Sequence, residues 1–130
     1  MTASLLLDTQ LLLWLRLSPE ALTDAERGAI DASAMRLVSA ASLWEISILL
    51  GLGKIRAPSE ETSAALLSIP AGFELLAITP EHCRSYRCLP LRHRDPFDRM
   101  LIAQARVEEA TLIARDRAMR RYVEDGLSLL

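Results

Sequence analysis

Short apolar runs alternate with helical patterns along this chain of 130 residues. The first run, Leu5–Leu7, stops at Asp8, and the apolar-rich segment 10–17 that follows it ends at Ser18-Pro19. Short runs of this kind, each followed by a helix, are typical of strands buried in a parallel sheet. The alternation therefore predicts an α/β fold, a three-layer α/β/α sandwich around a central, mainly parallel sheet.

Capping patterns and chain breaks predict the other elements. Further strands are expected at residues 37–39, 73–78, 111–114 and 127–130. Helices are expected to start near Thr23, Ser42, Ser59, Thr79, Asp95 and Asp116. No repeat or interdomain linker interrupts the series, so residues 1–130 are expected to form one domain.

Composition argues against several classes of protein. The chain is 51% apolar, enough to bury one core and to leave apolar surface for a second subunit or a partner. It lacks a run of about 20 apolar residues, which argues against a membrane-spanning helix. No basic segment precedes the apolar stretch 5–17, so we predict no export signal and expect a soluble, cytoplasmic protein. Cys83 and Cys88 have no second Cys/His pair, so no zinc framework is expected.

Two acidic residues follow predicted strands. Asp8 comes directly after the first strand, and Asp116 comes two residues after the strand at 111–114. In an open parallel sheet, ligands bind beyond the carboxyl ends of the strands. Both carboxylates are therefore expected at the ligand-binding edge.

Two further acids interrupt apolar helix faces. At helical spacing, Glu45 shares a face with Ala41, Ile48, Leu49 and Leu52. Asp98 shares a face with Leu101, Ile102 and Ala105. Both acids are expected to face inward or toward the same rim as Asp8 and Asp116.

Two carboxylates about 4 Å apart repel each other by roughly 4 kcal/mol at an effective dielectric near 20. A group of ionised carboxylates therefore needs something that offsets its negative charge. Protonation, pairing with Arg or Lys, or a cation with oxygen ligands such as Mg²⁺ or Mn²⁺ would each provide it. Each acid also has a purely structural explanation. Asp8 and Asp116 could cap helices, Glu45 could form a capping box with Ser42, and Asp98 could do so with Asp95.

Four motifs in order resemble those of the PIN-domain ribonucleases, and more closely the VapC-type toxins of bacterial toxin–antitoxin pairs. The resemblance runs from Leu5 to about Tyr122, and the segment from Arg94 to Ala105 is its most specific part. The motifs are LLDT at 6–9, SLWEIS at 42–47 with GLGKI at 51–55, HRDPFDRMLIAQA at 93–105, and ARDR at 114–117.

The resemblance implies a Mg²⁺- or Mn²⁺-dependent endoribonuclease, a homodimer, inhibited by a small antitoxin protein. It implies catalytic and metal-binding roles for four residues: Asp8, Glu45, Asp98 and Asp116. Asp95 matches a position that is commonly acidic in the family, but we assign it to capping or to support of the metal ligands, and Thr9 likewise to support. Water activated by the metal would attack the RNA phosphodiester and leave a 5′-phosphate on one product.

Two positions depart from the family pattern. Gln10 stands where the family often has His, and Ala114 stands where it often has Ser or Thr. The departures keep open a second hypothesis, a catalytically weak binding module that mainly pairs with an antitoxin. A phosphohydrolase or receiver-type domain is a third, but the first motif lacks the second nearby acid that such sites use.

Basic residues cluster near the last two motifs although the net charge is −2. Arg92, Arg94 and Arg99 are the preferred candidates for contacts to RNA phosphates. The wider set near these motifs is Arg84, Arg87, His93, Arg115, Arg117, Arg120 and Arg121. The alternative is a solvated helix face paired with Glu81, Glu108, Glu109 and Glu124.

Overall fold

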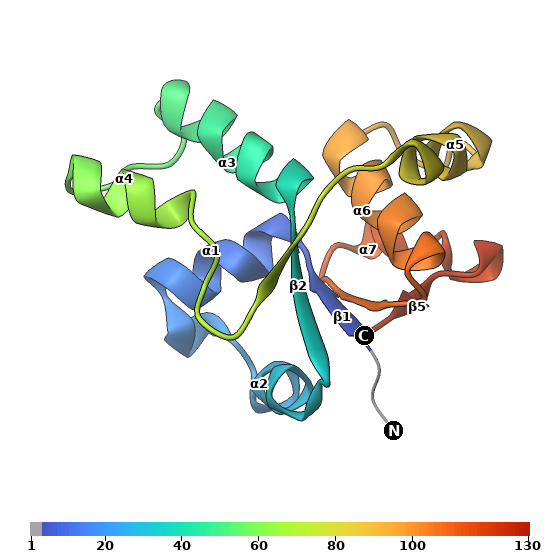
Figure 1. The fold of residues 1–130 in the computed structure, drawn as a ribbon, viewed down its shortest axis with the longest axis horizontal. Coiled ribbons are helices and arrows are strands. Elements are labelled where there is room, and N and C mark those ends of the chain that lie inside the picture. The colour runs from blue at the N-terminus through green and yellow to red at the C-terminus, as the bar shows by residue number, and fades with distance from the viewer. Residues whose placement is uncertain (1–3) are drawn as a thin grey trace.

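Five parallel strands form one central sheet in the order β3-β2-β1-β4-β5. The structure, a computed structural model, describes residues 4–130 (Figure 1). The strands are β1 (Ser4–Leu7), β2 (Met35–Ser39), β3 (Glu74–Leu76), β4 (Thr111–Ile113) and β5 (Ser128–Leu129). The predicted α/β/α sandwich is confirmed, and every strand pair in the described chain is parallel.

Helices cover both faces of the sheet (Figure 1). They are α1 (Thr9–Leu17), α2 (Asp24–Ala32), α3 (Ala40–Gly51), α4 (Glu60–Leu66), α5 (Pro80–Cys88), α6 (Pro96–Val107) and α7 (Arg117–Arg120), with 3₁₀ turns η1 (Pro19–Ala21) and η2 (Val123–Asp125). Helices α1 to α4 lie on one side of the strands and α5 to α7 on the other (Figure 1).

The strands are apolar on both faces because each face packs against helices. Leu6 and Leu112 belong to a cluster with Leu101 and Ile102 of α6, whereas their neighbours Leu5 and Leu7 belong to a second cluster. The second cluster contains side chains of the other helix layer, among them Leu11, Leu12, Ile30, Ile46 and Leu66. Alternate residues of one strand thus contribute to two separate cores.

Most predicted helix starts are confirmed, and one is wrong. Thr23 and Glu26 form the full capping box at the start of α2. Helix α3, however, begins three residues before the predicted site, and its N-cap is Ser39, whose hydroxyl accepts a hydrogen bond from the Ala41 amide at 3.0 Å. Ser42 is instead buried inside the helix. The structural explanation of Glu45 as the partner of Ser42 in a capping box is therefore excluded.

The strand predicted at 73–78 is shorter than expected, because β3 covers only Glu74–Leu76 and lies at the edge of the sheet, where its residues are mostly exposed. Both cysteines, Cys83 and Cys88, are free thiols. Among residues 4–130, no helix has the length and hydropathy needed to cross a membrane.

Candidate functional site

All four predicted acids line one pocket at the carboxyl edge of the sheet. The pocket has a volume of about 320 Å³. Asp8 enters it from the end of β1, Glu45 from α3, Asp98 from the first turn of α6, and Asp116 from the loop after β4. Asp95, Thr9 and Gln10 also line it. The edge lies where β1 separates β2 from β4, which is the position at which open parallel sheets bind ligands.

Asp8 combines a structural and a chemical role. Its Oδ1 accepts a hydrogen bond from the Leu11 amide at 2.8 Å and caps α1. The side chain is buried, and this burial raises its pKa to about 6, against the lowering effect of the Leu11 amide. Glu45 and Asp116 raise the pKa further by charge repulsion. The structural and functional explanations of Asp8 are therefore both compatible with its position.

Glu45 lies in the second turn of α3, half-buried beside the pocket. Its Oε1 is buried without a hydrogen-bond partner among residues 4–130. Burial raises the pKa of Glu45, while the Thr9 hydroxyl lowers it and the Asp95 charge raises it. The Thr9 hydroxyl donates its hydrogen to Ser42 Oγ at 3.0 Å, which links α1 to α3. A buried carboxylate oxygen without a partner is costly unless a proton or cation compensates it.

Asp98 has the most perturbed carboxyl group of the pocket. Burial is the main reason that its pKa rises to about 8, and repulsion from Asp95, Asp116, Glu45 and Asp8 adds to the rise. Asp98 Oδ2 lies 3.5 Å from His93 Nε2, whose ring nitrogen is itself buried without a hydrogen-bond partner in residues 4–130. Burial lowers the pKa of His93, although Asp116 and Asp95 raise it. Burial and repulsion in this pocket therefore favour the protonated form of Asp98.

Asp95 and Asp116 cap the helices that follow them. Asp95 Oδ1 accepts hydrogen bonds from the Phe97 and Asp98 amides at 2.9 and 3.1 Å. Asp116 Oδ1 accepts one from the Ala118 amide at 2.9 Å. Both carboxylates are exposed, so the caps leave them accessible from the pocket. Their backbone positions are fixed by the strand ends and helix starts that they join.

The donor set fits a hard cation better than zinc, because the pocket offers carboxylate oxygens and a hydroxyl. In the present side-chain positions, no three His, Cys, Asp or Glu residues between 4 and 130 meet closely enough to hold a metal ion. Mutual repulsion between carboxylates favours such separated positions. A bound cation would give the partnerless Oε1 of Glu45 a ligand. It would also stabilise the ionised forms of Asp8 and Asp98, whose pKa values are raised.

The three preferred arginines lie in different environments. Arg99 is buried, and its guanidinium donates to Tyr122 Oη at 2.8 Å and to the Pro90 carbonyl at 3.0 Å. Arg99 is therefore hydrogen-bonded to groups inside the protein, and its contact with RNA stays a prediction. Arg92 pairs with Asp125 at 2.7 Å on the surface, and Arg94 is exposed. For these two residues, RNA contact stays a prediction.

An ion pair at the pocket was not predicted from the sequence. Arg115 lines the pocket and donates to both carboxylate oxygens of Glu26, with Nε–Oε2 and Nη2–Oε1 distances of 2.7 and 2.6 Å. Its guanidinium carbon lies 4.3 Å from the ring centroid of Trp14. The hydrogen bonds from Arg115 hold the pKa of Glu26 at about 2. The capping box identified Glu26, but its second partner lies 89 residues away in the sequence.

The fold and this site define a PIN domain. The model of the PIN domain family matches residues 5–125, so the chain belongs to that family. No curated protein sequence matches the chain significantly.

Solved structures with the same fold cover almost the whole chain. A VapBC2 structure from Rickettsia felis, bound to a DNA fragment from its promoter, has a TM-score of 0.73 at 16% identity and covers 98% of this chain and 97% of that one. FitAcB from Neisseria gonorrhoeae has a TM-score of 0.67 at 17% identity, covering 97% and 96%. A toxin–antitoxin complex from Klebsiella pneumoniae has a TM-score of 0.62 at 16% identity, covering 96% and 94%.

Proposed function

We propose that this PIN domain is a Mg²⁺- or Mn²⁺-dependent endoribonuclease that acts as the toxin of a toxin–antitoxin pair. The observation that carries the proposal is the pocket itself, into which three segments distant in sequence bring Asp8, Glu45 and Asp98, each with a raised pKa. Perturbed carboxyl groups gathered in one cavity are typical of catalytic sites. Membership of the PIN family adds support, since PIN domains are generally nucleases.

Asp8, Glu45, Asp98 and Asp116 are the residues that would hold the metal. A bound Mg²⁺ or Mn²⁺ would supply an activated water and positive charge against the scissile phosphate. For this, Asp98 and Asp8 must lose the protons that burial favours, so metal binding and proton release are coupled. Thr9 would position α3, which carries Glu45, through its hydrogen bond to Ser42, and Asp95 would fix the first turn of α6 from behind Asp98.

The same proposal includes two protein partners, a small antitoxin and a second copy of this chain. Likeness of fold to toxin–antitoxin complexes supports the first. Large apolar side chains on the surface support protein contacts in general, because Trp44 is 61% and Leu52 65% exposed. Co-expression with the protein encoded by a short neighbouring reading frame tests the first partner: a stable complex supports it, and separation on gel filtration contradicts it. The mass of the isolated chain in solution tests the homodimer.

The second candidate is a PIN-fold binding module that cleaves RNA poorly. Ala114 favours it, because this buried methyl group stands at the end of β4 beside the pocket and offers no hydroxyl there. The two candidates differ in whether the acidic pocket turns over substrate, which an activity measurement decides.

The experiment compares purified wild type with Asp98→Asn on total RNA, in Mg²⁺, in Mn²⁺ and with a chelator. Cleavage by wild type that the chelator and the substitution both abolish supports the nuclease. Equal cleavage by both proteins, or cleavage that survives the chelator, contradicts the metal site. Absence of cleavage with retained binding of a co-encoded partner supports the binding module instead.

A further inference from the structure

Arg115 is the one cationic side chain among the described residues that line the acidic pocket. The rest of the lining includes Asp8, Glu45, Asp95, Asp98 and Asp116. A polyanion approaching five carboxylates is repelled unless cations lie at the same opening. A side chain that attracts an RNA phosphate to this opening should therefore be a cation in the pocket lining.

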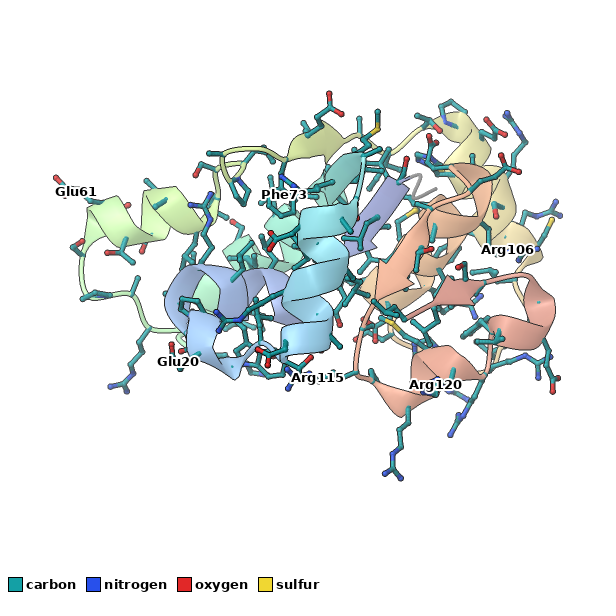
Figure 2. The ribbon with its side chains drawn as sticks, turned by 90° about the horizontal axis from the view of Figure 1, so that it is seen from below. Glu20, Glu61, Phe73, Arg106, Arg115 and Arg120 are labelled. Carbon is teal, nitrogen blue, oxygen red and sulfur yellow. The ribbon has the colours of Figure 1, made fainter. Side chains whose placement is uncertain are left out.

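The guanidinium of Arg115 is fixed from two sides. Nε and Nη2 donate to the Glu26 carboxylate, and Nη2 also donates to the Ala21 carbonyl at 2.6 Å. The guanidinium carbon lies over the Trp14 ring, 4.3 Å from its centroid, which restricts the position of the guanidinium. In Figure 2, Arg115 lies beside the first turn of α2, where Glu26 is located. A guanidinium held in this way loses little conformational entropy when it binds a further ligand.

These contacts leave one nitrogen for a ligand. Nη1 of Arg115 forms no hydrogen bond with residues 4–130, and the side chain is 40% exposed. By contrast, the guanidinium of Arg99 is enclosed, and Arg92 pairs with Asp125 outside this pocket. Arg115 thus combines exposure, a restricted position and membership of the pocket.

We propose that Arg115 binds a backbone phosphate of the RNA at the mouth of the acidic pocket, with Glu26 and Trp14 as its positioning residues. The inference rests on the proposed function and extends it to a specific contact. Arginine suits this role because its planar group can bond a phosphate while its other nitrogens stay paired. A purely structural role for Arg115, joining α2 to the loop after β4, is the alternative.

Binding of RNA separates the two roles when it is measured in an Asp98→Asn background, where the RNA stays intact. Fluorescence anisotropy of a labelled single-stranded RNA is recorded with Mg²⁺ between roughly 50 and 200 mM salt. Arg115→Gln is expected to weaken binding roughly tenfold, the loss of one charged hydrogen bond. The slope of log affinity against log salt should fall by about 0.7.

Glu26→Gln provides the discriminating comparison. Glutamine can keep the oxygen that accepts from the Thr23 amide and from Arg115 Nη2, so the capping box and one bond to the guanidinium remain. The substitution removes the negative charge that competes with a phosphate for Arg115. If Arg115 binds phosphate, Glu26→Gln raises RNA affinity. If the ion pair is only structural, both substitutions change affinity in the same direction, which would overturn the proposal.

Arg106→Gln is the matched control for loss of one positive charge. Arg106 lies in the last turn of α6, at the opposite end of that helix from Asp98, and well apart from Arg115 in Figure 2. Its removal is expected to change RNA affinity less than about twofold, because it is a surface charge remote from the pocket. Unchanged affinity in Arg115→Gln also overturns the proposal. If Arg115→Gln does not fold, Glu26→Gln decides alone: higher RNA affinity supports the phosphate contact, and unchanged or weaker affinity contradicts it.

Cleavage of the same RNA by wild type keeps this test separate from the nuclease proposal. An inactive wild type refutes the nuclease, while the affinities of Arg115→Gln and Glu26→Gln still decide whether Arg115 contacts RNA.

Discussion

The Ser39 hydroxyl donates a hydrogen bond to Gln104 Oε1 at 2.5 Å, and both side chains are fully buried. Ser39 is the N-cap of α3, which carries Glu45, and Gln104 belongs to α6, which carries Asp98. Gln104 Nε2 in turn donates to the Ala77 carbonyl at 3.4 Å. This bond between residues 65 positions apart therefore ties together the two helices that present acids to the pocket.

Loss of the hydrogen bond between Ser39 and Gln104 should lower the stability of the fold, and the effects of substituting the two residues should not be independent. Gln104→Met leaves the buried Ser39 hydroxyl without its acceptor, so we expect the free energy of unfolding to fall by about 1–3 kcal/mol. A double-mutant cycle with Ser39→Ala, measured by urea denaturation, should give a coupling of about 1 kcal/mol. If the changes in unfolding free energy of the two single substitutions simply add up in the double mutant, the hydrogen bond contributes no coupling energy and the prediction is contradicted.

Asp95 allows capping and charge to be separated. Asp95→Asn keeps an oxygen acceptor at the N-cap of α6, so the free energy of unfolding should stay within about 0.5 kcal/mol of wild type. Asp95→Ala should lower it by about 1 kcal/mol. Because Asp95 helps to raise the pKa of Asp98, both substitutions should lower the Asp98 pKa, measured by NMR titration. A pKa that moves only in the alanine variant would contradict this assignment.

The raised carboxyl pKa values predict an unusual dependence of stability on pH. Between about pH 4 and pH 8 the folded chain keeps a proton on Asp98 that the unfolded chain has released, and Asp8 adds the same effect up to about pH 6. The folded state then binds more protons, so the free energy of unfolding falls as pH rises. For metal-free protein we expect a loss on the order of a few kcal/mol between pH 5 and 8.

Urea denaturation of three proteins tests this pH dependence. Asp98→Asn should have a flatter profile and exceed wild type in stability at pH 8. Asp31→Asn, which changes an exposed carboxyl group at the end of α2, should keep the wild-type slope. Parallel profiles for wild type and Asp98→Asn would contradict the raised pKa of Asp98.

A divalent metal ion bound by the carboxylates should offset the loss of stability that the raised pKa values cause as pH rises. At a metal concentration of 100 times its Kd, binding adds about 2.7 kcal/mol to stability, which should raise the Tm of wild type by about 5 °C or more. Asp8→Asn should lose most of the rise, because it removes one charged ligand. Glu61→Gln is the control, because this exposed acid in α4 lies outside the pocket. An equal rise in Tm for Asp8→Asn and wild type would argue against a metal at Asp8.

Features set by neighbouring residues were predictable from the sequence. The positions of Asp8 and Asp116 follow from the strands that precede them, and the box between Thr23 and Glu26 follows from local spacing. The carboxyl edge of a parallel sheet then brings the two strand-end acids together. The fold class and the elements that line the pocket could be inferred in the same way.

Features that depend on tertiary packing could not be predicted from the sequence. Ser39 and Ser42 offer similar capping chemistry, and the end of β2 selects Ser39 because the strand continues to that residue. Arg99 was expected at the surface, yet its long side chain reaches Tyr122 across the core. The pairing of Arg115 with Glu26 joins segments 89 residues apart, and no local pattern specifies it.

Single-turnover cleavage of a defined, labelled single-stranded RNA tests the central claim most directly. Wild type in Mg²⁺ or Mn²⁺ should yield products with 5′-phosphate ends, and chelator should abolish the reaction. Asp98→Asn should cleave about 100-fold more slowly or worse, since even residues behind metal ligands contribute 10- to 100-fold. Asp31→Asn should match wild type. Cleavage that persists in chelator, or an Asp98→Asn rate within about threefold of wild type, would contradict a metal site built on these carboxylates.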